Sequence, residues 1–282
     1  MTQANNTVLT EGEMRQLRWS YENLEHPSLA ARLSNLLAEP IEEAISLLPK
    51  AWKKRLDNTL KANSYRTVRL ALFTINHRGN VRPQNRLHKL FAVGTGAAGG
   101  FFGPLTLVAE LPITTTLIIR SIANIALTQG EDLDDEDTRM ACVQVFALGA
   151  RTRDDEAADT GYYALRTILG LHFERDILEY AAHAQGPHIP AFIELTRAIA
   201  ARFGVLISDK AAVQMVPIAG AASGATVNYL FMKHFQDVAT GHFVVRRLER
   251  KYGADVIKDL YHSLAEEERE LEQDYSPVSY TH

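Results

Sequence analysis

Two uncharged stretches rich in glycine and alanine constrain most strongly what this chain folds into. The first, LFAVGTGAAGGFFGPLTLVA, covers residues 90–109, and the second, AAVQMVPIAGAASGATVNYLFM, covers residues 211–232. Each is about as long as a helix that crosses roughly 30 Å of hydrocarbon. Because glycine inside a helix costs about 1 kcal/mol relative to alanine, this density predicts helices that must pack closely or bend.

Glycines four residues apart recur in both stretches. This spacing flattens one face of a helix and lets a second backbone approach closely, in membranes and in soluble helix pairs. We expect the two stretches to form packed helical hairpins. The predicted packing glycines are Gly96, Gly99, Gly100, Gly103, Gly220 and Gly224.

The segment from Gly94 to Gly99 also matches the GxGxxG fingerprint of dinucleotide-binding proteins. That motif needs a preceding strand, a following helix and an acidic residue about 20 positions further on. No parallel-sheet pattern surrounds the match, and Glu110 comes too early. The packing interpretation is therefore favoured, and no nucleotide cofactor is predicted.

Apolar residues recur at helical spacing along almost the whole chain, without strand–helix alternation. The pattern predicts an all-α multi-helix bundle. We expect disorder over residues 1–10, a single domain over 11–270 and a flexible tail over 271–282. Within the domain, helices are predicted from Ala219 to about Tyr252 and from Leu260 to Leu271.

The net charge of −4 conceals two segments of opposite charge. Residues 50–89 contain eleven Lys or Arg against Asp57, whereas residues 131–159 contain ten acids against three Arg. The asymmetry indicates an anionic partner, although the alternative is that the two segments neutralise each other in the fold. No nucleic-acid-binding module is recognisable, so a lipid surface is favoured over nucleic acid. The cations predicted to meet it are Lys50, Lys53, Lys54, Arg55, Arg66, Arg69, Arg86 and Lys89.

Neither glycine-rich stretch is as apolar as a typical membrane-spanning helix, and basic residues flank both. Basic flanks are typical of segments that meet the cytoplasmic leaflet. Peripheral or hairpin-type association, full spanning and a plain soluble core stay open. The N-terminus, MTQANNTVLTEGEM, does not resemble a secretory signal, so a cytoplasmic location is expected.

Three polar residues lie in otherwise apolar helical segments and are predicted to be buried: Glu110, Arg120 and Asn228. Glu110 and Arg120 are close to three helical turns apart and share a face if Pro112 does not break the helix. A buried salt bridge is favoured over a functional polar site, because charges in apolar surroundings are usually paired.

The segment KHFQDVATGHF places His234, Asp237 and His242 on neighbouring turns of a predicted helix. With Glu110 from elsewhere, or alternatively Asp154 or Asp155, they form a candidate site for a divalent metal, since histidine and carboxylate are common zinc ligands. Neither an HExxH motif nor an EF-hand loop is present, so ordinary surface or helix-end roles for these residues are favoured over a metal site. No other cofactor is predicted.

Several long segments resemble the EcsC family: GGFFGPLTLVAELPITTTLIIRSIANIA, VFALGA, TGYYALR and SDKAAVQMVPIAGAASGATVNYLFMKHFQDVATGHFVVRRLERKYG. The resemblance covers roughly residues 28–253. It implies association with a membrane and supplies no reaction, because the biochemical activity of the family is undefined and no protease constellation is visible here.

These observations predict a cytoplasmic accessory protein at a membrane surface or a membrane protein complex. A metal-assisted hydrolase, or a helical module that binds a lipid or another small molecule, stays open as the alternative. The sequence leaves open whether the protein is an enzyme and what its oligomeric state is.

Overall fold

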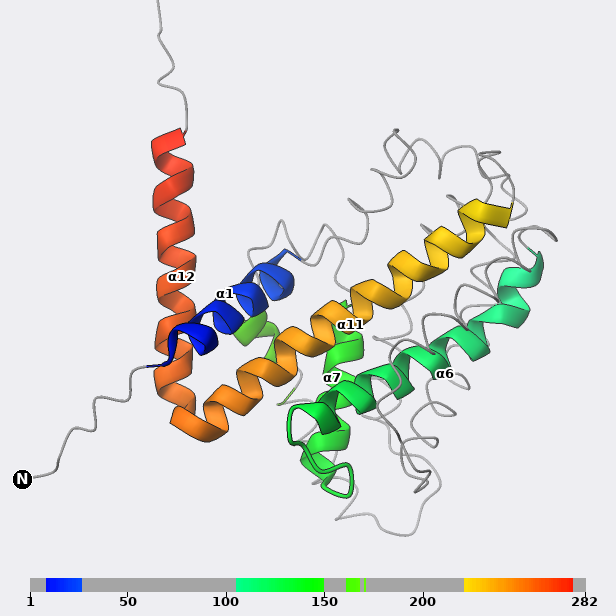
Figure 1. Ribbon diagram of the computed structural model, residues 1–282, viewed down its shortest axis with the longest axis horizontal. Coiled ribbons are helices and arrows are strands. Elements are labelled where there is room, and N and C mark those ends of the chain that lie inside the picture. Colours follow the sequence, from blue (N-terminus) through cyan, green and yellow to red (C-terminus); the bar gives the residue numbers. More distant parts are fainter. Residues whose placement is uncertain (1–8, 27–104, 150–160, 168–169, 171–220, 276–282) are drawn as a thin grey trace, which may run out of the picture.

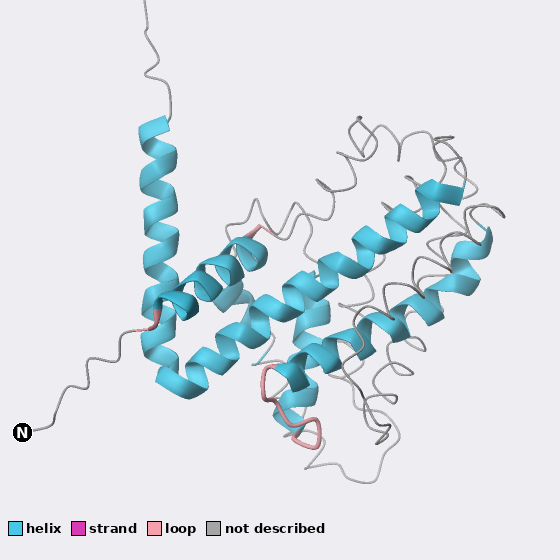
Figure 2. Ribbon diagram, in the orientation of Figure 1, coloured by secondary structure: helices cyan, strands magenta, loops and turns pink. Residues whose placement is uncertain are grey.

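The computed structural model describes residues 9–26, 105–149, 161–167, 170 and 221–275. In this part of the chain the secondary structure consists of helices, and no strand occurs (Figure 1, Figure 2). The prediction of an all-α fold is confirmed. The basic segment, the first glycine-rich stretch up to Pro104 and the first half of the second stretch lie outside the described residues.

The first helix, α1, spans Glu11–Glu25 and begins at a capping box. Thr10 Oγ1 accepts the backbone N–H of Glu13 at 3.3 Å, and the Glu13 carboxylate accepts the backbone N–H of Thr10 at 3.1 Å. Leu9, directly before the cap, is buried. Leu9 and Thr10 are therefore part of the described structure, although they fall in the range 1–10 for which the sequence pattern predicts disorder.

The next described helix, α6, spans Leu105–Thr128 and continues through Pro112. It ends in a Schellman motif, in which the amides of Gly130 and Glu131 both donate to α6 carbonyls at 3.1 Å. Gly130 has a φ of 79°, a conformation that favours glycine. This turn fixes the position of Glu131 and leads into α7, which spans Glu136–Gly149.

Two long helices complete the described fold. The first, α11, spans Ala221–Tyr252, close to the predicted bounds, and α12 spans Ala254–Tyr275. Gly253 separates them with a φ of 99°, and its amide donates to the Glu249 carbonyl at 2.8 Å. The final helix is longer than predicted at both ends, so it includes residues 271–275 of the predicted flexible tail.

Helices α6 and α11 lie side by side and run in the same direction (Figure 1). Gln236 Nε2 donates to Ser121 Oγ at 2.7 Å in the buried interface. Further along α11, Arg247 donates at 2.8 Å to Oε1 of Gln129, the residue directly after the end of α6. The order of these pairs along both helices establishes that the two helices are parallel.

Helices α1 and α7 run antiparallel to α11. Lys251 near the end of α11 pairs with Glu13 in the first turn of α1 at 2.6 Å, whereas Leu24 in the last turn of α1 lies against Gly241. Gly149 at the end of α7 lies against Phe235, nearer the start of α11. Helix α12 packs beside α1 and α11 (Figure 1).

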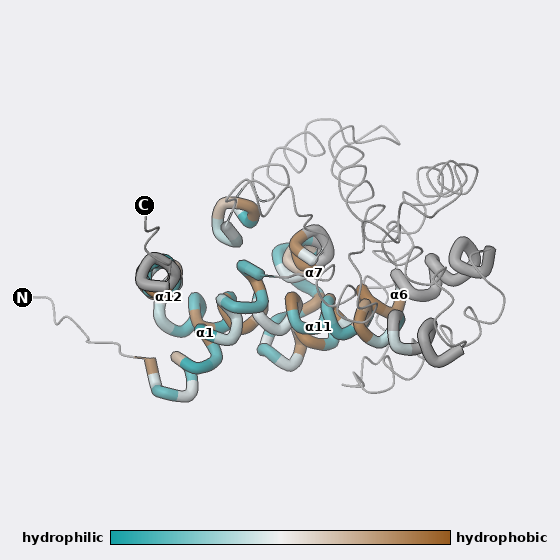
Figure 3. The backbone as a smooth tube through the Cα atoms, turned by 90° about the horizontal axis from the view of Figure 1, so that it is seen from above, coloured by the Kyte–Doolittle hydropathy of each residue, from teal (hydrophilic) through white to brown (hydrophobic). Residues whose placement is uncertain are grey.

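The core lies where α1, α6, α7 and α11 meet, and Figure 3 shows apolar residues concentrated on α6, α7 and α11 there. Two glycines permit the closest approaches. A Cβ on Gly149 would lie 2.6 Å from Phe235 Cε1, and one on Gly241 would lie 3.0 Å from Leu24 Cγ. The largest fully buried side chains are Tyr162, Phe231, Phe235, Phe243, Leu17, Leu24 and Ile118.

Candidate functional site

A buried polar network links the segment 161–167 to α11, and we call it the tyrosine–histidine network. The Tyr162 hydroxyl lies 2.9 Å from His242 Nδ1, and Arg166 Nη1 donates to the same hydroxyl at 3.3 Å. Arg166 also makes two bonds to the Glu249 carboxylate, at 2.8 and 2.9 Å, and the Tyr163 hydroxyl donates to this carboxylate at 3.0 Å. The network thus joins five side chains that come from only two segments.

Local helical geometry brings these side chains together. Tyr162 and Arg166 are four residues apart in a helical segment, and His242 and Glu249 are two turns apart on α11, so each pair shares one helix face. The carboxylate of Glu25 caps the segment, because it accepts the Tyr162 backbone N–H at 3.0 and 3.2 Å.

An aromatic cluster surrounds the network on the side of α12. The Tyr261 ring lies 5.1 Å from those of Tyr21 and Tyr163 and 5.5 Å from that of Tyr162, measured between ring centroids. These separations are typical of favourable edge-to-face or offset ring pairs. Through Tyr261, α12 covers the tyrosines of the network.

Burial sets the protonation states of the network. It raises the pKa of Tyr162 to about 12, so this phenol keeps its proton at neutral pH. Burial also lowers the pKa of His242 well below its ordinary value, and the positive charges of Arg166 and Arg246 lower it further. His242 is therefore neutral at pH 7, and its ring is fully enclosed.

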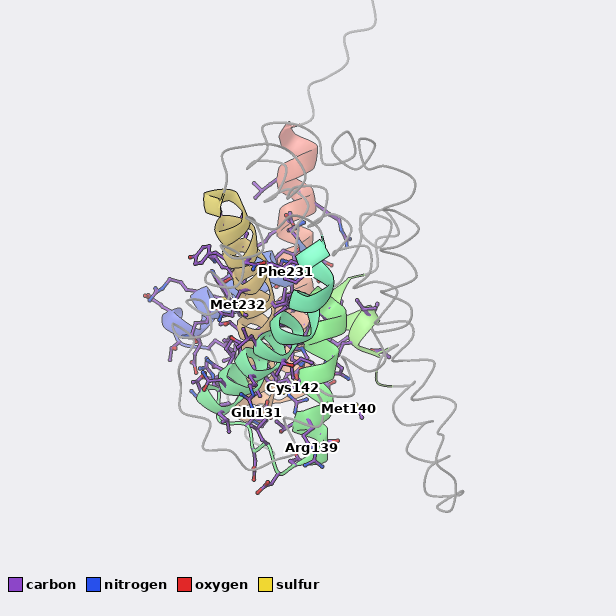
Figure 4. All side chains as sticks on the ribbon, turned by 90° about the vertical axis from the view of Figure 1, so that its right-hand side faces the viewer. Glu131, Arg139, Met140, Cys142, Phe231 and Met232 are labelled. Carbon is purple, nitrogen blue, oxygen red and sulfur yellow. The ribbon has the colours of Figure 1, made fainter. Side chains whose placement is uncertain are left out.

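A second polar cluster lies at the Schellman turn and is centred on Glu131. Arg246 donates to the Glu131 carboxylate at 2.8 and 3.3 Å, Arg250 bonds the same carboxylate, and Thr138 donates to it at 3.1 Å. Burial raises the pKa of Glu131, but the two arginines outweigh burial and hold it below the usual value. Figure 4 shows Glu131 and Arg139 toward the same end of the molecule.

The profile of the EcsC protein family matches residues 11–248, a range that includes Tyr162, His242 and Glu131. This chain belongs to the EcsC protein family. The resemblance in the sequence is confirmed. No curated protein and no solved structure matches the chain. In this EcsC protein, α12 follows the matched range.

The residues of the candidate metal site have separate partners in the EcsC chain. His234 Nε2 lies 2.6 Å from the Gly149 carbonyl oxygen, Asp237 pairs with Lys233 at 2.7 Å, and His242 belongs to the tyrosine–histidine network. Glu110 lies in α6, where its side chain is outside the described part. Among the residues that the structure describes, no three His, Cys, Asp or Glu side chains are grouped as metal ligands.

The predicted buried polar residues differ in their environments. Asn228 is fully buried in α11, whereas Arg120 is exposed. Leu127, seven residues after Arg120, is also exposed, whereas the intervening residues 121–126 are all buried. The predicted Glu110–Arg120 bridge involves the Glu110 side chain, which lies outside the described part of the chain.

Most of the residues predicted to meet a membrane surface or to pack helices together lie outside the described part of the EcsC chain. All eight predicted surface cations, together with Gly96, Gly99, Gly100, Gly103 and Gly220, lie outside the described residues, and Gly224 lies near the start of α11. No helix in the described ranges is both long and apolar enough to cross a membrane.

The network residues Tyr162, Tyr163, Arg166 and Glu249 were missed as site residues by sequence reasoning. The available signal was the segment TGYYALR, in which adjacent tyrosines precede an arginine at helical spacing from Tyr162. That pattern does not reveal its partners, because His242 is 80 residues away in the sequence.

Proposed function

We propose that this EcsC protein is an accessory protein that binds the anionic cytoplasmic face of a membrane, or a membrane complex there, through residues 50–89. The observation that carries the proposal is the composition of this basic segment, with eleven Lys or Arg against Asp57. Clustered basic residues close to an anionic bilayer contribute about 1 kcal/mol each.

The ion pairs of the described residues support this proposal. If the acidic segment 131–159 neutralised the basic segment, its acids would face those cations. Glu131, the first acid of that segment, instead pairs with Arg246 and Arg250 of α11. Glu131 is therefore neutralised by two arginines of α11.

The tyrosine–histidine network favours a scaffolding role for the helical domain over a reaction centred on His242. Tyr162 and His242 are both fully buried, and the Arg166 guanidinium is occupied by Glu249 and Tyr162. A general base must come within hydrogen-bond reach of the proton that it removes. Enclosed in this way, His242 joins helices and does not meet an external substrate.

Sedimentation of the full chain with lipid vesicles tests the proposal. We expect binding to vesicles that contain phosphatidylglycerol, little binding to pure phosphatidylcholine vesicles, and release as the salt concentration rises. Replacing Lys53, Lys54 and Arg55 together by Glu should weaken binding by about tenfold or more.

The matched control makes the same change of net charge on the described surface, by replacing exposed Arg15, Lys258 and Arg269 together by Glu. This control should retain most of the binding, because it leaves the basic segment intact. Equal losses in the two triple variants would refute a specific role for residues 50–89. Absence of binding at low salt would refute membrane association itself.

A further inference from the structure

One atom of the tyrosine–histidine network has an unmet hydrogen-bonding requirement. His242 Nε2 is buried and has no hydrogen-bond partner among the residues that the structure describes. The other ring nitrogen, Nδ1, is occupied by the Tyr162 hydroxyl at 2.9 Å. A buried polar atom left unpaired costs about 1–3 kcal/mol. We therefore expect a small polar group, other than the described side chains, beside His242 Nε2.

The network determines where the proton of His242 lies. The guanidinium of Arg166 can only donate, so at 3.3 Å it donates to the Tyr162 oxygen. The hydroxyl proton of Tyr162 is then directed to the nearest acceptor, His242 Nδ1. Because His242 is neutral, its single ring proton must lie on Nε2. His242 Nε2 is therefore an N–H donor, and the group that it lacks is an acceptor oxygen.

We propose that His242 Nε2–H donates to one water molecule enclosed in the core beside α11. Globular proteins hold roughly one buried water per 27 residues, each typically bonded to polar groups that the chain leaves unsatisfied. Burial, Arg166 and Arg246 keep the His242 ring neutral, so Nε2 offers a single N–H donor that a water oxygen can accept. The water completes a donor series that runs from Arg166 through Tyr162 to His242.

Long-range ¹H–¹⁵N NMR of the full chain tests this site. We expect the His242 imidazole to carry its proton on Nε2, and the Hε2 proton to show a cross-peak with water. His234 provides the internal control, because its Nε2 lies 2.6 Å from a carbonyl oxygen and must also be protonated. The His234 Hε2 proton should show no such water contact.

The variant Tyr162→Phe tests whether the hydrogen bonds are donated from Arg166 to Tyr162 and from Tyr162 to His242. Removing the hydroxyl leaves Nδ1 without its donor, so the preference for the Nε2–H form should weaken, while His234 should not change. Protonation of His242 on Nδ1 in the natural chain would overturn the proposal. So would an Nε2–H proton without a water contact. A small organic acceptor in place of water would appear as a fixed added mass in native mass spectrometry, and would also overturn it.

Discussion

The Glu25 carboxylate accepts the backbone N–H of Tyr162 through both oxygens, at 3.0 and 3.2 Å, across 137 residues of sequence. The last turn of α1 therefore caps the segment that carries Tyr162 and Arg166. The same carboxylate lies close to Tyr261 of α12, where burial first and the charge of Glu25 second raise the pKa of the phenol. One side chain thus connects α1, the tyrosine–histidine network and α12.

Replacing Glu25 by Gln should lower the free energy of unfolding by about 1–2 kcal/mol, because the capping interaction loses its charge and one acceptor oxygen. Urea unfolding followed by circular dichroism measures the change. The control is Glu22→Gln on the same helix, where the side chain is exposed and a change within about 0.5 kcal/mol is expected. Equal effects of the two substitutions would show that Glu25 does not act as a cap.

The stability of the protein should fall as the pH drops below about 6.5, the ordinary pKa of histidine. The folded state holds His242 neutral, whereas the unfolded chain takes up a proton there, so acid favours unfolding. Below this pH, the contribution of His242 to the slope of the free energy of unfolding against pH approaches about 1.4 kcal/mol per pH unit. Urea unfolding at a series of pH values measures it.

The variant His242→Gln should remove that part of the pH dependence. NMR titration of the natural chain checks the same point without a variant, because the His242 ring should stay neutral at pH values where a histidine in an unfolded peptide is charged. An imidazolium at His242 under those conditions, with the protein still folded, would contradict the protonation assigned to the network.

Only part of this arrangement is visible in the sequence. The spacing of Leu17, Tyr21 and Leu24 predicts one apolar face of α1, and all three are buried. The bounds of α11 were predicted to within two residues of its start, because apolar positions recur at helical spacing along its whole length. Such local signals depend on residues three or four positions apart.

The candidate site depends on contacts that local patterns do not encode. The network forms because the segment 161–167 packs on α11, and Glu131 reaches Arg246 because Gly130 ends α6 in a left-handed turn. The close-contact glycines were also missed. Gly149 and Gly241 have no glycine four residues away, and their neighbours come from other helices.

Replacing Gly149 by Ala should destabilise the fold by about 1–3 kcal/mol, because the new methyl group would overlap the buried Phe235 ring. Thermal unfolding compared with the natural chain measures this. The control is Gly12→Ala in the first turn of α1, where the nearest atoms lie 4.0 Å from the added carbon. That change should be neutral or slightly stabilising, since alanine favours helices. A neutral Gly149→Ala variant would contradict the close packing of α7 on α11.

Replacing Glu131 by Gln should lower the free energy of unfolding by roughly 2–4 kcal/mol, because Arg246 and Arg250 would lose their shared carboxylate in a largely buried setting. The matched change at exposed Glu266 should have little effect. Urea unfolding of both variants shows whether the ion pairs of Glu131 stabilise the fold or contribute little to its stability. A loss below about 0.5 kcal/mol for Glu131→Gln would indicate the latter.

Membrane fractionation of the native protein tests the proposed function most directly. The membrane pellet is washed first with high salt and then with alkaline carbonate, and the protein is followed by immunoblotting. We predict that it sediments with membranes at low salt and is released by the salt wash, because residues 50–89 hold it by charge. Recovery in the supernatant from the start, or resistance to both washes, would contradict a peripheral, charge-driven association.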